Sequence, residues 1–151
     1  MYVCFFKRVI DLVLSICAFP FWLMIFIPVA IAIKLDDGGP IFYSSARVGK
    51  GFKKFSMYKF RSMKVNAPDL RNADGGTWNS ADDPRVTKIG KFLRETSLDE
   101  TPQLLNIIKG DMSIIGPRAG DWESVDTYKD DEKDKCKVVP GLTGYCQAYF
   151  R

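Results

Sequence analysis

The sequence contains no histidine among its 151 residues, and none of its four cysteines forms a C-x-x-C pair. Zinc sites are built mainly from cysteine and histidine, and the general base in catalysis is most often histidine. The composition therefore argues against a zinc centre and against a mechanism with a histidine base. A metal ion bound by this chain would be a hard cation on carboxylate oxygens, with Mg²⁺ as the first candidate.

A large excess of positive charge is also lacking. The 22 Lys and Arg residues face 18 Asp and Glu residues, which leaves a net charge of +4. With no recognised nucleic-acid-binding motif, this balance argues against a nucleic-acid partner. The basic residues are concentrated locally, however, with eight of them and only two acids between residues 34 and 64. Such a segment predicts a surface for anionic lipid head groups or phosphorylated substrates.

Charge is absent from residues 12–33, a run of 22 residues that is long enough for a transmembrane helix of about 20 residues. Pro20 interrupts this run and removes a helical hydrogen bond. A helix bent there would have arms of about 12 Å (residues 12–19) and about 20 Å (residues 21–33) at 1.5 Å per residue. Neither arm crosses a hydrocarbon core of about 30 Å. The run alone leaves a spanning helix and a re-entrant helix broken at Pro20 both open.

Basic residues flank both ends of the apolar run, with Lys7 and Arg8 before it and Lys34 after it. Under the positive-inside rule this pattern suits two ends that lie on the same, cytosolic face. Asp11 stands near the start of the run, where a carboxylate needs a partner. We expect that partner to be Arg8 or a free backbone N–H.

The rest of the chain predicts a small α+β domain. Two β-prone stretches surround Gly49-Lys50-Gly51, which indicates a hairpin. Amphipathic spacing predicts helices that bury one face. The further elements expected along the chain are a long surface loop at 66–85, helices at 86–95 and 98–108, a short strand at 112–118, a solvated helix at 121–135 and a turn at 140–144.

Two adjacent acids, Asp99 and Glu100, stand just ahead of Pro102. Ser97 and Glu100 have the spacing of a capping box, in which the two residues satisfy each other's backbone N–H groups. A competing helix start has Thr101 at the N-cap and Pro102 at the first helical position. Both starts predict that the acid pair lies at a helix entrance, and both remain open.

Taken together, these features resemble the bacterial sugar transferases, the monotopic phosphoglycosyl transferases. The resemblance runs in order over nearly the whole chain. The stretches that carry it are KRVIDLVLS (7–15), IKLDDGGPIFY (33–43), ARVGKGFKKFSMYKFRSM (46–63), DPRVTKIGKFLRETSLDETPQLLNIIKGDMSIIGPR (83–118) and PGLTGYCQ (140–147).

The resemblance implies a function. Members of the family transfer a phosphosugar from a UDP-sugar to a polyprenol phosphate, usually undecaprenyl phosphate, with Mg²⁺ and release of UMP. It implies that Asp99 is the nucleophile, which forms an aspartyl-phosphosugar intermediate, and that Glu100 assists it and helps to hold the metal. It also implies a re-entrant helix at residues 1–35 and a cytosolic catalytic domain at 36–151, monotopic on the cytosolic face of the bacterial inner membrane.

A carboxylate that attacks a pyrophosphate needs cations around it, because it approaches several negative charges. Arginine suits this task, since its planar fork binds phosphate in a bidentate manner. The candidates within the matching stretches are Lys59, Arg61, Arg85, Arg94 and Arg118. For each of them the alternative is a surface ion pair.

The sequence also departs from the family pattern. Phe19 precedes Pro20 where the family commonly has serine, and Ser15, one turn earlier, is the expected substitute for the missing hydroxyl. Thr101 replaces the apolar residue of the usual DELPQ pattern. The remaining departures are Ala119 in place of a proline and Tyr145 in place of a tryptophan.

Family members generally continue beyond the position of Arg151 with further amphipathic helices, so we expect this chain to be shortened at its C-terminus. The alternative function is therefore a membrane-anchored scaffold or binding module that keeps the fold without turnover. The sequence does not predict which sugar is carried or which oligomer forms.

Overall fold

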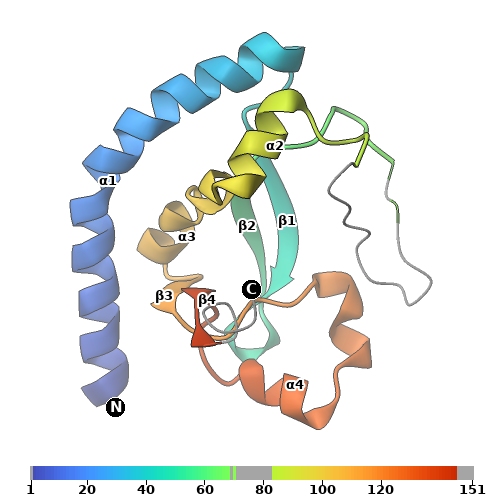
Figure 1. The fold of residues 1–151 in the computed structure, drawn as a ribbon. Helices are drawn as coiled ribbons and strands as arrows, with labels where there is room; N and C mark the ends of the chain where they lie inside the picture. Colours follow the sequence, from blue (N-terminus) through green and yellow to red (C-terminus); the bar gives the residue numbers. More distant parts are fainter. Residues whose placement is uncertain (1, 69, 71–82, 146–151) are drawn as a thin grey trace.

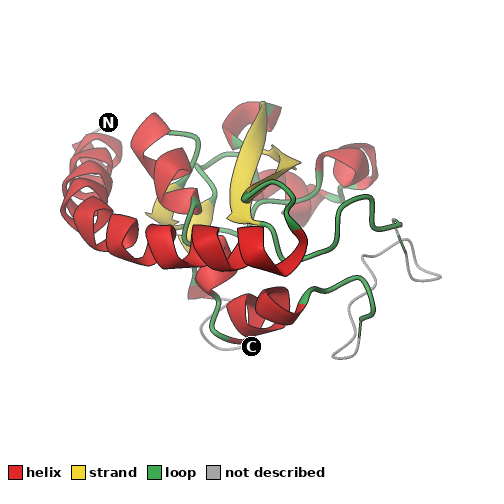
Figure 2. Ribbon diagram, turned by 90° about the horizontal axis from the view of Figure 1, so that it is seen from above, coloured by secondary structure: helices red, strands yellow, loops and turns green. Residues whose placement is uncertain are grey.

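The computed structural model describes residues 2–68, 70 and 83–145, so most of the predicted loop at 66–85 lies outside the described residues. The chain begins with a helix of 36 residues, α1 (Tyr2–Asp37), which contains Pro20 and Pro28. Pro20 lies at the midpoint of this helix, and the ribbon turns in its middle part (Figures 1 and 2). The apolar run is therefore one continuous, bent helix, which ends two residues past the boundary predicted at residue 35.

The predicted hairpin is confirmed. Strands β1 (Phe42–Val48) and β2 (Lys54–Phe60) pair antiparallel, with Phe42 opposite Phe60 and Val48 opposite Lys54. The turn between them contains a short 3₁₀ helix, η1 (Lys50–Phe52). Gly51 in this turn has φ of 65°, a left-handed conformation that glycine adopts without steric cost.

Three helical elements follow the hairpin: α2 (Lys88–Glu95), the 3₁₀ helix η2 (Leu98–Glu100) and α3 (Gln103–Lys109). Thr87 caps α2, since its side chain accepts a hydrogen bond from the backbone N–H of Gly90 at 3.0 Å. The prediction of a helix at 86–95 is confirmed. The second predicted helix is shorter than expected, because the chain forms a separate 3₁₀ turn before α3 begins.

The last elements are β3 (Ser113–Ile115), the 3₁₀ helix η3 (Trp122–Thr127), α4 (Asp130–Lys135) and β4 (Gly141–Thr143). The single helix predicted at 121–135 is thus two short ones. The turn predicted at 140–144 is wrong, because β4 pairs in parallel with β3. The two backbone segments approach so closely that a Cβ on Gly141 would lie 2.0 Å from the backbone nitrogen of Gly116. Only the tertiary pairing explains this glycine.

One face of α1 belongs to the core of the folded domain. Trp22, Val29 and Ile33 are buried in a cluster with Phe60 of β2 and Leu93 of α2. The aromatic rings continue this contact into the hairpin, as the Trp22 and Phe60 centroids lie 6.5 Å apart. A second cluster joins β2, α3 and the segment before β3 through buried Met57, Ile107 and Met112.

The opposite face of α1 is exposed and apolar. By length and composition, the stretch Phe5–Asp37 is sufficient to cross a membrane. Its exposed large apolar side chains are Phe5, Phe6, Val9, Ile10, Val13, Leu14, Ile16, Phe21, Leu23, Met24, Ile25, Ile27, Ile31 and Leu35. Burying such a face away from water is strongly favourable, which suggests that α1 associates with a membrane.

The N-terminal half of α1 is joined to the domain by polar contacts. Arg8 donates to the backbone carbonyls of Ile107 and Ile108, the latter at 2.8 Å, and so supplies charge at the C-terminal end of α3. The buried Asp11 carboxylate accepts from the backbone N–H of Ile114 at 3.1 Å and from the Ser113 hydroxyl at 2.7 Å. The expectation of a backbone N–H partner for Asp11 is confirmed, while Arg8 is not that partner.

The expected role of Ser15 is wrong. Its side chain is buried, and its hydroxyl has no hydrogen-bond partner among the described residues. The hydroxyl therefore does not bond to the backbone around Pro20.

Candidate active site

The acid pair lies in η2, between α2 and α3. Ser97, just before it, has φ of 57° and no side-chain capping hydrogen bond, so the predicted capping box is wrong. Its backbone N–H bonds to the Arg94 carbonyl at 3.1 Å, because Ser97 is the left-handed residue that ends α2. The competing start, with Thr101 at the N-cap and Pro102 at the first helical position, is off by one residue, because Pro102 occupies the N-cap and α3 begins at Gln103.

Glu100 is held by cationic and polar neighbours. The Lys59 ammonium donates to Glu100 Oε1 at 2.7 Å, and Arg118 Nη2 lies 3.6 Å from the same oxygen. Burial favours the protonated acid, but Lys59, Arg118 and a side-chain hydrogen bond from Gln103 outweigh it and lower the pKa of Glu100. Glu100 is therefore a carboxylate whose negative charge is already compensated.

Asp99 has a different environment. It is partly buried, and no side-chain hydrogen bond or ion pair joins its carboxylate to another described residue. Burial and the neighbouring Glu100 charge raise the pKa of Asp99, although the charges of Lys59 and Arg94 oppose that shift. One acid of the pair is thus engaged, and the other is left with an uncommitted carboxylate close to two cations.

Lys59 is positioned by a buried amide on α3. Asn106 Oδ1 accepts from the Tyr58 backbone N–H at 3.0 Å, and its Nδ2 donates to the Ser56 carbonyl at 2.8 Å. The Asn106 side chain therefore pairs with the free edge of β2 as a neighbouring strand would. This contact fixes the distance between β2, which carries Lys59, and the helix that follows Glu100.

Arg94 is positioned by the close approach of α2 to the chain after β2. Gly90 allows this approach, since a Cβ there would lie 2.0 Å from the Ser62 carbonyl oxygen. Arg94, one turn further along α2, donates from Nε to the Ser62 hydroxyl at 2.9 Å. The guanidinium is thereby held on the side of α2 that faces residues 98–101, the turn that contains Asp99 and Glu100. We call this segment the acid turn.

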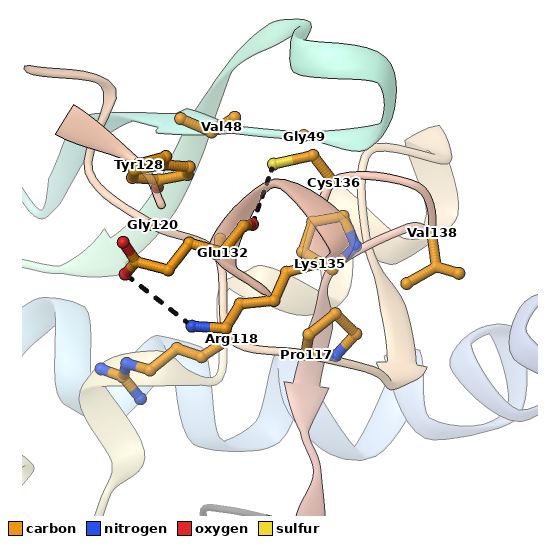
Figure 3. Close-up of a pocket in the computed structure, with 12 residues that line it drawn as sticks. Val48, Gly49, Pro117, Arg118, Gly120, Tyr128, Glu132, Lys135, Cys136 and Val138 are labelled. Carbon is orange, nitrogen blue, oxygen red and sulfur yellow. Dashed lines mark hydrogen bonds and ion pairs between the residues drawn. The ribbon is translucent and has the colours of Figure 1, made fainter. Parts of the chain in front are cut away.

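Arg118 follows β3 and the Gly116-Pro117 turn, and its side chain is 62% exposed. It borders a small recess of about 60 Å³ whose lining includes Tyr128, Glu132 and Cys136. Figure 3 shows that the Arg118 guanidinium points away from these side chains. On its other side Arg118 lines a second, narrower recess together with Glu100.

Arg61 and Arg85 contact other carboxylates. Arg61 binds Asp37 at the end of α1 through both terminal nitrogens, with Nη1 at 2.9 Å from Oδ2. Arg85 pairs with the buried Asp83 at 2.7 Å and donates to the Pro68 carbonyl at 3.0 Å, so it joins the two described ends of the long loop. Hydrogen bonds from Arg85 lower the pKa of Asp83 although burial raises it.

The structure thus brings Lys59, Arg94 and Arg118 to the acid pair, and it pairs Arg61 and Arg85 with other acids. The phosphate-binding role of all five residues stays a prediction. Sequence reasoning did not single out Gln103 or Arg47, which line the narrow recess with Glu100. Arg47 belongs to one of the matching stretches, but nothing in its spacing indicated that β1 would carry it to the acid pair.

The family model described as "Bacterial sugar transferase" matches residues 2–151. The chain belongs to the bacterial sugar transferase family. The predicted family is therefore confirmed.

Three curated relatives illustrate the family. A putative undecaprenyl-phosphate N-acetylgalactosaminyl 1-phosphate transferase of Bacillus subtilis (strain 168) is 46% identical over 112 residues, which cover 74% of this chain and 60% of the relative. The undecaprenyl-phosphate galactose phosphotransferase of Salmonella typhimurium is 40% identical over 97% of this chain and 33% of its own length. The UDP-glucose:undecaprenyl-phosphate glucose-1-phosphate transferase of Escherichia coli (strain K12) is 39% identical over 93% of this chain and 30% of its own length. The chain thus spans from less than a third to 60% of the length of these relatives.

The acid pair of this family member has a donor set that fits magnesium. The residues that the structure describes contain no group of three or more His, Cys, Asp or Glu side chains able to hold a metal. Mg²⁺ is commonly bound by one or two carboxylates, with waters and substrate phosphates as the remaining ligands. Asp99 and Glu100 can supply that pair of oxygen donors, with Lys59 already on one oxygen of Glu100.

Proposed function

We propose that this chain transfers a phosphosugar from a UDP-sugar to undecaprenyl phosphate and releases UMP, as the first membrane step in the assembly of a glycoconjugate or exopolysaccharide. The names of the Salmonella and E. coli relatives support this class of donor and acceptor. The observation that carries the proposal is the acid pair. An uncommitted Asp99 carboxylate lies close to Lys59 and Arg94, and the neighbouring Glu100 is paired with Lys59 and Arg118.

In the first step, an Asp99 carboxylate oxygen attacks the sugar-bearing phosphorus of the donor. The bond from this phosphorus to the bridging oxygen of the UMP moiety breaks, and UMP leaves with the electron pair. The product on the protein is an aspartyl-phosphosugar. Its support is the lack of a side-chain partner for Asp99, which leaves the carboxylate oxygens free to approach the phosphorus.

In the second step, a phosphate oxygen of undecaprenyl phosphate attacks the same phosphorus. The bond between phosphorus and Asp99 breaks, the carboxylate is restored and a lipid-linked diphosphosugar is formed. Splitting the transfer in this way suits one soluble and one membrane-bound substrate, because the two need not be bound together.

Lys59, Arg94 and Arg118 bind the non-bridging phosphate oxygens and compensate their negative charge in both steps. Phosphoryl transfer depends mainly on such positioning and charge stabilisation. Asp99 and Glu100 would hold Mg²⁺, which when bound would supply further positive charge to the phosphate oxygens. The phosphate-binding role of Arg61 and Arg85 stays a prediction, and both guanidinium groups are paired with Asp37 and Asp83.

The membrane arrangement is part of the proposal: α1 is re-entrant and monotopic, with the domain on the cytosolic face of the inner membrane. Arg8 and Asp11 near one end of α1 contact α3 and β3. At the other end, Asp36 accepts from the Ile89 backbone N–H at 3.1 Å and Asp37 binds Arg61. Because both ends of α1 contact the same domain, we expect both ends to lie on the same side of the bilayer.

The test is UMP release by the full chain in nanodiscs that contain undecaprenyl phosphate and Mg²⁺, with UDP-glucose, UDP-galactose and UDP-N-acetylgalactosamine as donors. We expect release with one of them, loss of release in Asp99→Asn and no loss in Asp126→Asn, a matched change of an exposed acid. Without acceptor, intact-mass spectrometry should detect a protein heavier by one phosphosugar, and Asp99→Asn should lack it.

Unchanged UMP release in Asp99→Asn would show that the nucleophile is assigned wrongly. No release by a folded wild-type chain with any UDP-sugar would favour the scaffold or binding module instead.

A further inference from the structure

The acid turn is joined to the membrane helix by a hydrogen bond that the family pattern does not predict. The Trp22 indole Nε1–H donates to Thr101 Oγ1, with 3.3 Å between the two atoms. Thr101 follows Glu100 directly and replaces the apolar residue usual at this position. Trp22 lies on α1, 79 positions away in the sequence and two residues after Pro20.

The Thr101 hydroxyl is the middle of a short chain of hydrogen bonds. It accepts from Trp22 and donates to the Leu98 carbonyl at 2.8 Å. The Thr101 backbone N–H bonds to the same carbonyl at 3.1 Å. Leu98 and Thr101 enclose the two acids, so the hydroxyl links both ends of the acid turn to α1.

The side chain of Glu100 is held by Lys59, but the backbone of the acid turn has only weak constraints of its own. Ser97 precedes it in a left-handed conformation, which is strained for a residue with a Cβ. The turn hydrogen bond from the Glu100 N–H to the Ser97 carbonyl is 3.3 Å long. Trp22, in contrast, is rigidly held, since it is only 8% exposed and its ring stacks on Phe60.

We propose that Thr101 is a positioning residue, which fixes the acid turn against the membrane helix through Trp22. The inference rests on the proposed function, in which Asp99 attacks the donor phosphorus. Lys59, Arg94 and Arg118 belong to β2, α2 and the segment after β3, so they do not depend on this hydrogen bond. Losing it moves the carboxylates relative to the phosphate-binding cations, and therefore lowers kcat while the KM for the UDP-sugar is retained.

The experiment compares Thr101→Val, which removes the hydroxyl and keeps the shape, with Thr101→Ser, which keeps the hydroxyl. The matched control is Thr127→Val. Thr127 likewise donates from its hydroxyl to the carbonyl three residues earlier, Ser124, at 2.7 Å at the end of a 3₁₀ helix. Among the described residues, its hydroxyl makes no hydrogen bond to α1.

Two readouts are needed. UMP release in nanodiscs gives kcat and KM for the UDP-sugar that serves the wild type. The NMR spectrum gives the resonance of the Trp22 indole N–H, assigned by its loss in Trp22→Phe, and the exchange rates of the Glu100 and Thr101 amide protons.

In Thr101→Val we expect the indole resonance to shift, the two amides to exchange faster and kcat to fall about 3- to 10-fold, as befits one hydrogen bond. KM should stay within about twofold, because the cations bind the phosphates. Thr101→Ser should behave as the wild type. The double variant of Trp22→Phe and Thr101→Val should lose no more kcat than the larger single loss.

An unmoved indole resonance in Thr101→Val, or unchanged amide exchange, would overturn the inference. So would equal losses of kcat in Thr101→Val and Thr127→Val, or a failure of Thr101→Ser to restore it. If the wild type itself releases no UMP, the proposed function fails, and the indole and amide measurements still decide whether Thr101 holds the acid turn.

Discussion

Two adjacent carboxylates differ in this chain because their neighbours differ. Glu100 shares one oxygen between Lys59 and Arg118, while Asp99 has charges nearby but no side-chain partner. The tertiary contacts of β2 and of the segment after β3 therefore give the two adjacent acids different side-chain partners, a difference that residue type and spacing do not predict. This difference supports the proposed role of Asp99 as nucleophile and of Glu100 as its supporting acid.

Lys59 is the cation for which the structure makes the sharpest prediction. Replacing Lys59 with methionine removes the ammonium that lies on Glu100 and faces the phosphate site. We expect kcat/KM for UMP release to fall about 100-fold, the scale found when one stabilising donor is lost from a polar active site. Lys64→Met is the control, since Lys64 is exposed. Equal activity of the two variants would exclude Lys59 from the site.

The ion pair of Asp37 and Arg61 predicts an acid-dependent stability. Burial raises the pKa of Asp37, but hydrogen bonds from Arg61 and the Gly39 N–H and the charge of Arg61 lower it overall. A lowered pKa in the folded state stabilises the fold above the unfolded pKa of about 4, and this stability is lost as the pH falls through the folded value.

We expect Asp37→Asn to lower the melting temperature at pH 7 and to reduce its dependence on pH below about 4. The measurement is thermal unfolding in detergent at a series of pH values, with Asp126→Asn for comparison. If the melting temperature of Asp37→Asn falls with decreasing pH as steeply as that of the wild type, the ion pair does not contribute to the stability.

At the scale of elements, the site depends on where short helices meet the hairpin. Asn106 fixes α3 to β2, and Gly90 lets α2 lie against Ser62. The spacing of apolar residues predicted α2, and β-prone stretches around Gly49-Lys50-Gly51 predicted the hairpin, because both patterns are local. Neither pattern specified which polar side chain would meet which strand edge, since those contacts join residues about 30 to 50 positions apart.

Gly90→Ala tests the docking of α2. The added methyl group would overlap the Ser62 carbonyl, so α2 must move outward and take Arg94 with it. We expect a loss of about 1–3 kcal/mol in the free energy of unfolding, the usual cost of overpacking, together with reduced UMP release. Lys88→Ala is the control in the same helix, because Lys88 is exposed. Wild-type stability in Gly90→Ala would contradict the close approach.

At the scale of the whole molecule, α1 serves two environments. Trp22, Val29 and Ile33 complete the domain core, while most of the opposite side chains are apolar and exposed. The helix thus joins the acid turn to the surface that we assign to the membrane. The bend in its middle follows from Pro20, which removes one helical hydrogen bond.

The re-entrant topology predicts that both ends of α1 are accessible from the cytosol. Single cysteines in place of Lys7 and Lys34, which are exposed and flank the apolar run, would be placed in a cysteine-free chain. A membrane-impermeant maleimide should label both in inverted vesicles and neither in intact spheroplasts. Labelling of either Lys7→Cys or Lys34→Cys from the periplasmic side would establish a spanning helix.

The sequence by itself determined the family, the hairpin, α2, the apolar helix and the identity of the acid pair, since each of these rests on local spacing or on a contiguous motif. It also placed Lys59, Arg94 and Arg118 among its candidates. Only the tertiary structure separated these three from Arg61 and Arg85, and only it identified Asn106, Gln103 and the hydrogen bond between Trp22 and Thr101. The reason is physical: the partner of a side chain depends on how segments distant in the sequence pack together, and such packing leaves no periodic pattern in the sequence.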